Sequence, residues 1–192
     1  MATSILDRAD RRRAYLVFVD EAGFMLAPIV RRTWAPRGCT PVIRVSEPHG
    51  RISAIGAITI GPNRRDFGLH FHLLADNANF KGDSIASFLE EMRCVVSGPI
   101  TLLWDQIPVH FAVPVRKYFA KHRRIVVEPL PQYAPELNPV DYVWSYVKYA
   151  RLSNYCPRNL NELRGRVTEE LTRLQGRADL LGSFFKHTGL TL

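Results

Sequence analysis

Hydrophobic residues in the first third of the chain form short runs that end on polar or turn-forming residues. The run from Tyr15 to Val19 is unbroken and rich in β-forming residues, which predicts a buried strand ending at Asp20-Glu21. Met25 to Trp34 and Arg51 to Ile60 predict two more strands, each closed by a stretch containing Pro and Gly. Gly68 to Leu74 is a candidate for a further strand. Consecutive short strands of this kind predict an antiparallel meander.

The middle of the chain alternates between helical and strand patterns. Gly82-Asp83-Ser84 offers helix-capping residues before an amphipathic stripe that ends near Gly98. Ile100 to Trp104 is a second fully apolar strand and runs directly into Asp105. A helix from Pro114 to His122 and a strand from Ile125 to Leu130 follow. This alternation predicts an α/β layer with some parallel pairing.

Four prolines between residues 129 and 139 predict an ordered loop, and a helix begins directly after it. Asn138 is the expected N-cap and Pro139 the first helical residue. An apolar stripe at helical spacing then follows, formed by Val140, Val143, Trp144 and Val147. Two more stripes, from Leu160 to Leu174 and from Leu180 to Phe185, predict the last two helices.

Size, charge and cysteine usage narrow the class of protein. A chain of 192 residues fits one domain, expected to span residues 1–192, and no apolar run approaches the roughly 20 residues that cross a bilayer. The formal net charge of +8 favours a polyanionic partner such as nucleic acid. The three cysteines are far apart and form no C-x-x-C pair, so we expect reduced thiols in a cytoplasmic protein rather than disulfides or a zinc site.

Three aspartates are candidates for chemistry. Asp20 and Asp105 each follow a predicted buried strand, and Asp141 lies in the first turn of the helix after the proline loop. Open α/β sheets bind their ligands at such strand ends. Each residue also has a sufficient structural role, because Asp commonly begins a turn and an acid in the first helical turn favours the helix dipole. Taken singly, the three residues therefore leave both interpretations open.

The residues around these acids carry a resemblance that joins them. The segments concerned are Phe18-Val19-Asp20-Glu21-Ala22-Gly23-Phe24, Trp34-Ala35-Pro36-Arg37-Gly38 with Thr40-Pro41, Leu103-Trp104-Asp105, and the long segment from Leu130-Pro131-Gln132-Tyr133 through Asn138-Pro139-Val140-Asp141-Tyr142-Val143-Trp144. In this order they resemble the DDE-superfamily transposases of bacterial insertion sequences, related to the mariner group. The resemblance covers roughly residues 14 to 150, and the last motif is the most specific.

The resemblance implies a fold, an activity and a set of metal ligands. Members of the family have a ribonuclease-H-like α/β fold with a mixed five-stranded sheet flanked by helices, in which the acids lie on the first strand, on the fourth strand and on a following helix. Carried over by motif, the catalytic and metal-binding residues are Asp20, Asp105 and Asp141, and their spacing is close to the family's. The implied cofactors are two Mg²⁺ or Mn²⁺ ions, and the implied reactions are DNA phosphodiester hydrolysis and strand transfer in transposition.

The sequence departs from the family in three places. Gln106 stands where Asn usually follows the second acid, Asp141 is shorter than the Glu often found as the third acid, and the helix-turn-helix region that usually recognises transposon ends is expected to be absent. The mariner group also uses Asp as its third acid. The alternatives are therefore an inactive DNA-binding or assembly remnant, or a structure-selective nuclease. Expected partners are transposon-end and target DNA, a companion polypeptide for end recognition, and a second copy of the chain, in a bacterial, nucleoid-associated setting.

Further residues are candidates for supporting roles. Glu21 is expected on the opposite strand face from Asp20, as a solvated or supporting acid, and Glu136 is the fallback third metal ligand. His110 either contacts phosphate, assists proton transfer or caps locally, and Trp34 either stacks on a base or, as we favour, anchors its turn. His70 and His72 are interpreted as ordinary strand residues. The other candidate DNA contacts are Arg37, Arg116, Lys117, Arg123, Arg124 and Lys148.

Overall fold

A mixed five-stranded sheet forms the centre of the protein, in the order β3-β2-β1-β4-β5. The computed structural model describes residues 2–45, 49–131 and 134–190; Gln132 and Tyr133 of the proline loop lie outside that part. The strands are β1 (Tyr15–Met25), β2 (Arg51–Ile60), β3 (Phe67–Leu73), β4 (Ile100–Trp104) and β5 (Ile125–Pro129). β1 pairs antiparallel with β2 and parallel with β4, while β2–β3 is antiparallel and β4–β5 parallel.

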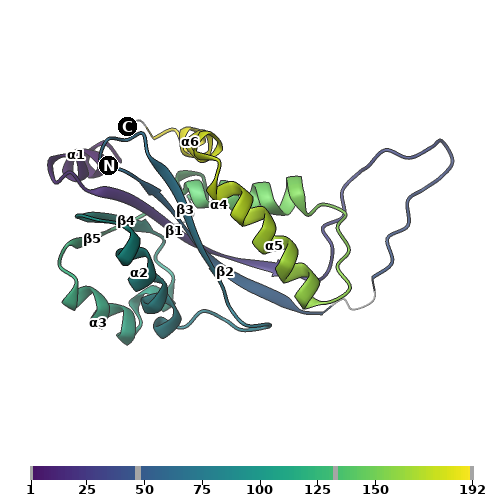
Figure 1. The fold of residues 1–192 in the computed structure, drawn as a ribbon, viewed down its shortest axis with the longest axis horizontal. Helices are drawn as coiled ribbons and strands as arrows, with labels where there is room; N and C mark the ends of the chain where they lie inside the picture. The colour runs from purple at the N-terminus through teal and green to yellow at the C-terminus, as the bar shows by residue number, and fades with distance from the viewer. Residues whose placement is uncertain (1, 46–48, 132–133, 191–192) are drawn as a thin grey trace.

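Helices cover both faces of this sheet (Figure 1). Their bounds are α1 (Ala2–Arg11), α2 (Gly82–Val95), α3 (Val113–Lys121), α4 (Pro139–Ser145), α5 (Leu160–Gln175) and α6 (Ala178–His187). Short 3₁₀ turns η1 (Pro108–Phe111) and η2 (Pro135–Leu137) precede α3 and α4, and the π-helical turn η3 (Tyr146–Arg151) continues α4. None of the helices in the described residues is long and apolar enough to cross a membrane.

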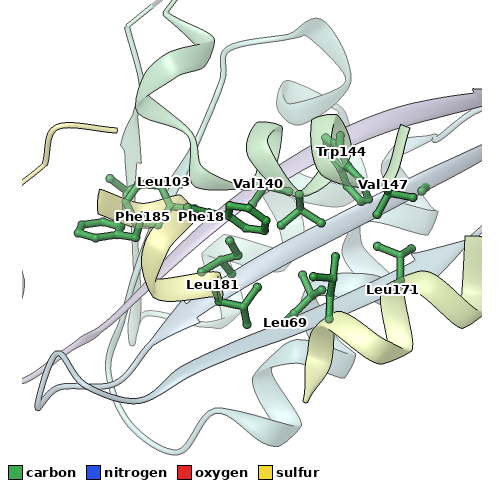
Figure 2. Close-up of a cluster of buried hydrophobic side chains, with 14 of the residues drawn as sticks. Phe18, Leu69, Leu103, Val140, Trp144, Val147, Leu171, Leu181 and Phe185 are labelled. Carbon is green, nitrogen blue, oxygen red and sulfur yellow. The ribbon is translucent and has the colours of Figure 1, made fainter. Parts of the chain in front are cut away.

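Two hydrophobic cores hold the layers together. On one face α1, α4, α5 and α6 pack on the sheet, and Figure 2 shows Phe18 and Phe185 among the side chains of this core. The rings of these two residues meet edge to face with centroids 5.8 Å apart. On the other face α2 and α3 bury residues such as Phe88 and Tyr118 against β1 and β4. Burying a large apolar side chain contributes about 1.5–3 kcal/mol, so both helical layers are firmly attached.

The sequence-based elements in the second half of the chain are confirmed. The helix after the proline loop begins at Pro139, and the Asn138 side chain accepts a hydrogen bond from the Val140 amide, as expected of an N-cap. The parallel pairing expected for the α/β part is that of β1 with β4 and of β4 with β5. The mixed five-stranded sheet flanked by helices is also the predicted fold class.

Two predictions near the N-terminus are wrong. The first strand does not end at Asp20-Glu21 but continues to Met25, because residues 20–25 find pairing partners in residues 51–56 of β2. The strand expected from Met25 to Trp34 does not form; after β1 the chain leaves the sheet and makes only an isolated bridge between Ile29 and Ser153. Figure 1 shows this segment extending away from the sheet at the end opposite α1.

The N-terminal helix α1 was not expected from the sequence. Its apolar face is only a few residues wide, and it buries Leu6 and Ala9 against the core on the α4 side. Arg8 on its outer face pairs with Glu128 of β5 at 2.7 Å. The segment is strongly amphipathic but polar overall, so its helical periodicity was present in the sequence and was passed over because few of its residues are apolar.

Candidate active site

The three aspartates come from three separate elements and line one pocket. Asp20 lies within β1, Asp105 directly follows β4, and Asp141 is the third residue of α4. Because β1 and β4 are parallel neighbours, their chains reach the same edge of the sheet, and α4 begins beside it. The pocket has a volume of about 480 Å³, and Asp20, Asp105 and Asp141 are among its lining residues. The structure thus brings together the three acids named from the sequence.

Asp20 is held by a tryptophan that approaches across a glycine. The indole Nε1 of Trp144 donates a hydrogen bond of 2.9 Å to Oδ2 of Asp20. In the β1–β2 register Asp20 lies opposite Gly56, and a Cβ on Gly56 would come within 2.8 Å of the Trp144 ring. Only glycine at this position leaves room for the indole to approach β2 closely enough to reach the Asp20 carboxylate.

Burial and repulsion make the charge on Asp20 costly. Desolvation is the largest cause of its raised pKa, and the charges of Asp141, Glu21 and Asp105 raise the pKa further. The pKa of Asp141 is also raised, first by burial and then by Asp105, although the nearby Lys148 acts in the opposite direction. Carboxylates that repel one another in a shared pocket form a site that a divalent cation would neutralise.

His110 links two carboxylates on the other side of the pocket. Its Nδ1 lies 3.1 Å from Oδ1 of Asp105 and 3.0 Å from the Asp105 carbonyl oxygen, and its Nε2 lies 3.0 Å from Oε1 of Glu21. The ring stacks on Trp104 with centroids 3.8 Å apart and planes within 2°. The buried ring therefore fixes the orientations of both carboxyl groups.

The charges of this linked group shift its pKa values. Burial alone would lower the pKa of His110, but its hydrogen bonds to Asp105 and Glu21 raise that pKa to about 9. For Asp105 the effects are reversed. Partial burial alone would raise its pKa, but the hydrogen bond and the charge of His110 outweigh burial and lower the pKa. The two pKa shifts have opposite directions, as expected for a pair in which a protonated imidazole and an ionised carboxylate stabilise one another.

Two sets of side chains are candidates for holding a metal ion. In the described residues, the ligand atoms of Glu21, Asp105 and His110 all lie within 4.8 Å of one another. Without metal, each ring nitrogen of His110 lies within hydrogen-bonding distance of a carboxylate oxygen, so this set forms a hydrogen-bonded link. Asp20, Asp105 and Asp141 form the second candidate set: they line one pocket and offer the carboxylate oxygens that hard divalent cations prefer, although in the described residues their ligand atoms do not all lie within that 4.8 Å.

The proline loop closes one side of the pocket. Asn138 donates to the Val19 carbonyl at 3.0 Å, which attaches the start of α4 to the strand that carries Asp20. Gln106 donates to the Leu130 carbonyl at 3.2 Å and so attaches the Asp105 turn to the loop. This amide, the departure from the family pattern, thus has a structural contact. Glu136, the fallback ligand, is exposed and is not among the pocket-lining residues.

The predicted DNA contacts fall into three groups. Arg37, Arg116, Lys117 and Arg123 are exposed, and Lys148 lies close enough to Asp20 and Asp141 to interact with both charges. Trp34 is 99% exposed, so the favoured interpretation that it anchors its turn is wrong. Arg124 and His110 point inward: Arg124 donates to the carbonyls of Arg93 and Val96, and the His110 side chain is 1% exposed. These internal contacts leave neither residue presented to a DNA surface.

Several site residues escaped the sequence-based interpretation. Trp144 was placed in the apolar stripe of its helix and in the last motif of the resemblance but was given no role at the acids, and Gly56 was not singled out. Glu21 was expected to be a solvated or supporting acid; in the structure its Oε1 pairs with Nε2 of His110, which lies 89 positions away. His72, interpreted as an ordinary strand residue, lies 3.7 Å from Glu91 at the surface. Long-range side-chain pairs of this kind leave no periodic signal in one sequence.

Comparison with known proteins agrees with this geometry. A family model described as DDE superfamily endonuclease matches residues 15–164. Comparison with curated protein sequences gives no match. The structure is similar to the Mos1 mariner paired end complex with Mn, at a TM-score of 0.65 and 16% identity over 98% of this chain and 58% of that chain. It is also similar to the Mos1 transposase catalytic domain with Raltegravir and Mg, at a TM-score of 0.61 and 15% identity. That match covers 98% of this chain and 88% of the Mos1 chain. These likenesses confirm the ribonuclease-H-like fold; this chain spans 58% of the first Mos1 chain's length.

Proposed function

The chain belongs to the DDE superfamily of endonucleases, and from this premise we propose that it is the catalytic domain of a DNA transposase. The observation that carries the proposal is that Asp20, Asp105 and Asp141, which come from three separate elements, line one pocket. Burial and neighbouring carboxylates raise the pKa values of Asp20 and Asp141 there. The Mos1 structures of the same fold were determined with transposon ends and in a strand transfer complex, which supports the same substrate class here.

In the proposed mechanism the three aspartates hold two Mg²⁺ or Mn²⁺ ions. Bound ions of this kind activate an attacking oxygen and stabilise a leaving oxygen at a phosphodiester. Trp144 fixes the Asp20 carboxylate, and His110 fixes the Asp105 carboxylate. Both carboxylates are therefore oriented before substrate arrives. Lys148 lies beside Asp20 and Asp141, where its positive charge favours an incoming phosphate.

The same pocket serves both proposed steps. Water would attack the phosphodiester at a transposon end, breaking its P–O3′ bond and leaving a 5′-phosphate and a free 3′-hydroxyl. That hydroxyl would then attack a phosphodiester of target DNA: a new P–O bond forms, the target's P–O3′ bond breaks, and the departing 3′-oxygen takes up a proton as the attacking hydroxyl gives one up. No side chain of the protein becomes covalently attached. Joining two ends favours two copies of the chain acting together, and a companion polypeptide supplies end recognition in this proposal.

The test measures nicking of supercoiled plasmid DNA by the purified chain with Mn²⁺ or Mg²⁺. We expect metal-dependent nicking that Asp20→Asn, Asp105→Asn and Asp141→Asn each reduce by at least 100-fold, since each removes a metal ligand. Asp179→Asn, at a surface ion pair with Arg177, is the matched control and should nick normally. Equal nicking by all five proteins would contradict the proposal.

A second assay separates a transposase from a nuclease of the same fold. A labelled duplex with free 3′-hydroxyl ends is incubated with plasmid and Mn²⁺, and joined products are counted. Joining supports the transposase; nicking without joining indicates a nuclease. An absence of both, together with an absence of saturable thermal stabilisation by Mn²⁺, would indicate an inactive remnant.

A further inference from the structure

Two surface hollows lie beside η3 and the segment that follows β1. The first, here called the near hollow, has a volume of about 190 Å³ and is lined by Phe24, Lys148, Tyr149 and nine other residues. The second, the far hollow, has a volume of about 530 Å³ and is lined by Val30, Arg31, Arg32, Tyr149, Ser153 and Asn154. Tyr149 is among the lining residues of both hollows.

Charge along these hollows has one sign. Lys148 begins the path, because its charge interacts with both Asp20 and Asp141 while its Nζ lies 5.5 Å from the centroid of the Phe24 ring. Arg31 and Arg32 line its far end. No carboxylate is among the residues that line either hollow, and within the described part of the chain neither arginine forms an ion pair.

The basic far end is held in place by contacts to a distant part of the chain. The Arg31 amide donates to Oδ1 of Asn154 at 2.8 Å, and the Asn154 amide donates to the Ile29 carbonyl at 2.9 Å. Ile29 also bridges to Ser153 as in a parallel strand. The Arg31 guanidinium lies 5.7 Å from the centroid of the Tyr149 ring, which is 48% exposed. The segment after β1 is thus fixed against η3 before any ligand binds.

The hollow between α2 and α3 provides a contrast. Lys117 and Lys121 line it, but so do Asp83 and Glu90. Charges of both signs largely cancel for a polyanion that passes nearby. Of these surface hollows, the near and far hollows are therefore the ones suited to a chain of phosphates.

We propose that the DNA strand attached to the reacting phosphate runs from the acidic pocket over Lys148 and Tyr149 to Arg31 and Arg32, which contact its phosphates. This assignment rests on the proposed function and adds the path of the substrate. Guanidinium groups pair well with phosphate oxygens, and an aromatic face beside them supports a sugar or a base. The contacts are to the backbone, so they position DNA without reading its sequence.

The test measures the salt dependence of DNA binding in the absence of metal. Fluorescence anisotropy of a labelled duplex of mixed sequence is recorded with EDTA, for the full chain and for the double variant Arg31→Ala with Arg32→Ala. Each lost phosphate contact lowers the slope of log K against log salt by about 0.9, so the expected decrease is about 2. At ~0.1 M salt the Kd should rise roughly tenfold to fiftyfold.

A matched control removes the same charge at the other end of the sheet. Arg11 and Arg65 are exposed, and the β2–β3 turn that holds Arg65 is attached to α1 through the contact of Arg64 with Asp10. The double variant Arg11→Ala with Arg65→Ala should keep a slope within about 0.5 of the original. If both double variants lowered the slope of log K against log salt equally, the decrease would reflect net charge alone. That result would overturn the proposed DNA path.

Two further arms keep the outcome unambiguous. Arg32→Ala alone removes a side chain with no hydrogen bond in the described structure, so it tests the path without disturbing the Arg31–Tyr149 contact; it should lower the slope by about 1. Nicking assays on the same proteins separate this proposal from the proposed function. Metal-dependent nicking with an unchanged slope would refute only the path, whereas a lowered slope without any nicking would refute only the enzyme.

Discussion

The indole Nε1 of Trp144 lies 2.9 Å from Oδ2 of Asp20, and this hydrogen bond joins α4 to the strand at the centre of the sheet. The same helix carries Asp141 one turn earlier. One short helix therefore supplies one acid and orients another. On the proposed function, we expect the Trp144–Asp20 contact to influence metal affinity as well as packing.

Replacing Trp144 with Phe should weaken metal binding while the core stays filled. The Phe ring occupies much of the same space but cannot donate to Asp20, and removing such a supporting contact typically costs 10–100-fold in metal affinity. The measurement is the Mn²⁺ concentration that gives half of the maximal thermal stabilisation. Trp34→Phe is the control, because Trp34 is 99% exposed. Identical Mn²⁺ titrations for the two variants would contradict this role.

Gly56→Ala should destabilise the protein by about 1–3 kcal/mol, because the new methyl group would lie 2.8 Å from the Trp144 ring and force it to move. Denaturant unfolding measures the free-energy change. Gly23→Ala, on the neighbouring strand β1, is the control: nothing lies within 4 Å of the added carbon, and its cost should stay below about 0.5 kcal/mol. A harmless Gly56→Ala would mean that the indole does not need this close approach.

In the absence of metal, Asp20→Asn should make the protein more stable at neutral pH. The raised pKa of Asp20, caused first by burial and then by its acidic neighbours, means that ionising it opposes folding. The neutral amide oxygen can still accept from Trp144. We expect the Tm to rise by at least about 2 °C, the shift that ~1 kcal/mol gives in a domain of this size.

The same variant should lose its thermal response to Mn²⁺. Asp179→Asn is the comparison, because Arg177 lowers the pKa of Asp179 to about 2 and ionisation of Asp179 therefore favours folding. Removing this carboxylate should not raise the Tm. A metal-free Asp20→Asn protein that melts below the unmodified protein would show that the acids do not repel one another.

His110 should make the metal-free protein lose stability as the pH rises. Its folded pKa of about 9 lies above the ordinary value of 6.5, so its contribution is fully present below pH 6.5 and is lost as the pH passes through 9. Unfolding is measured from pH 6 to pH 10 in EDTA for the full chain and for His110→Gln. The difference between the two free energies should shrink across this range; a constant difference would argue against the charged bridge.

The sequence-based prediction succeeded where local signals coincide. Asn138, Pro139 and the apolar stripe that follows define the start of α4, and this start places Asp141 at the pocket. Asp105 was located because a fully apolar strand ends directly before it. In both cases the residues that decide the structure are neighbours in the chain.

Prediction failed where the deciding partner is distant. The polar pair Asp20-Glu21 looked like a strand end, but β2 pairs with β1 as far as Met25, and that pairing is not visible in the residues of β1 alone. Trp144 looked like an ordinary core residue, since its reach to Asp20 depends on the missing side chain at Gly56. The orientation of the acids, unlike their identity, is therefore a tertiary property.

The distribution of the acids over β1, the end of β4 and α4 has a consequence during synthesis. A growing chain that has emerged only as far as Asp105 contains the antiparallel strands β1, β2 and β3, which can pair locally, but it lacks the last acid. Parallel pairing of β1 with β4 closes a long loop and is slow to form. On the proposed function, a nascent chain is therefore expected to lack a complete acidic site, and hence to cut no DNA, until α4 has left the ribosome and docked on the sheet.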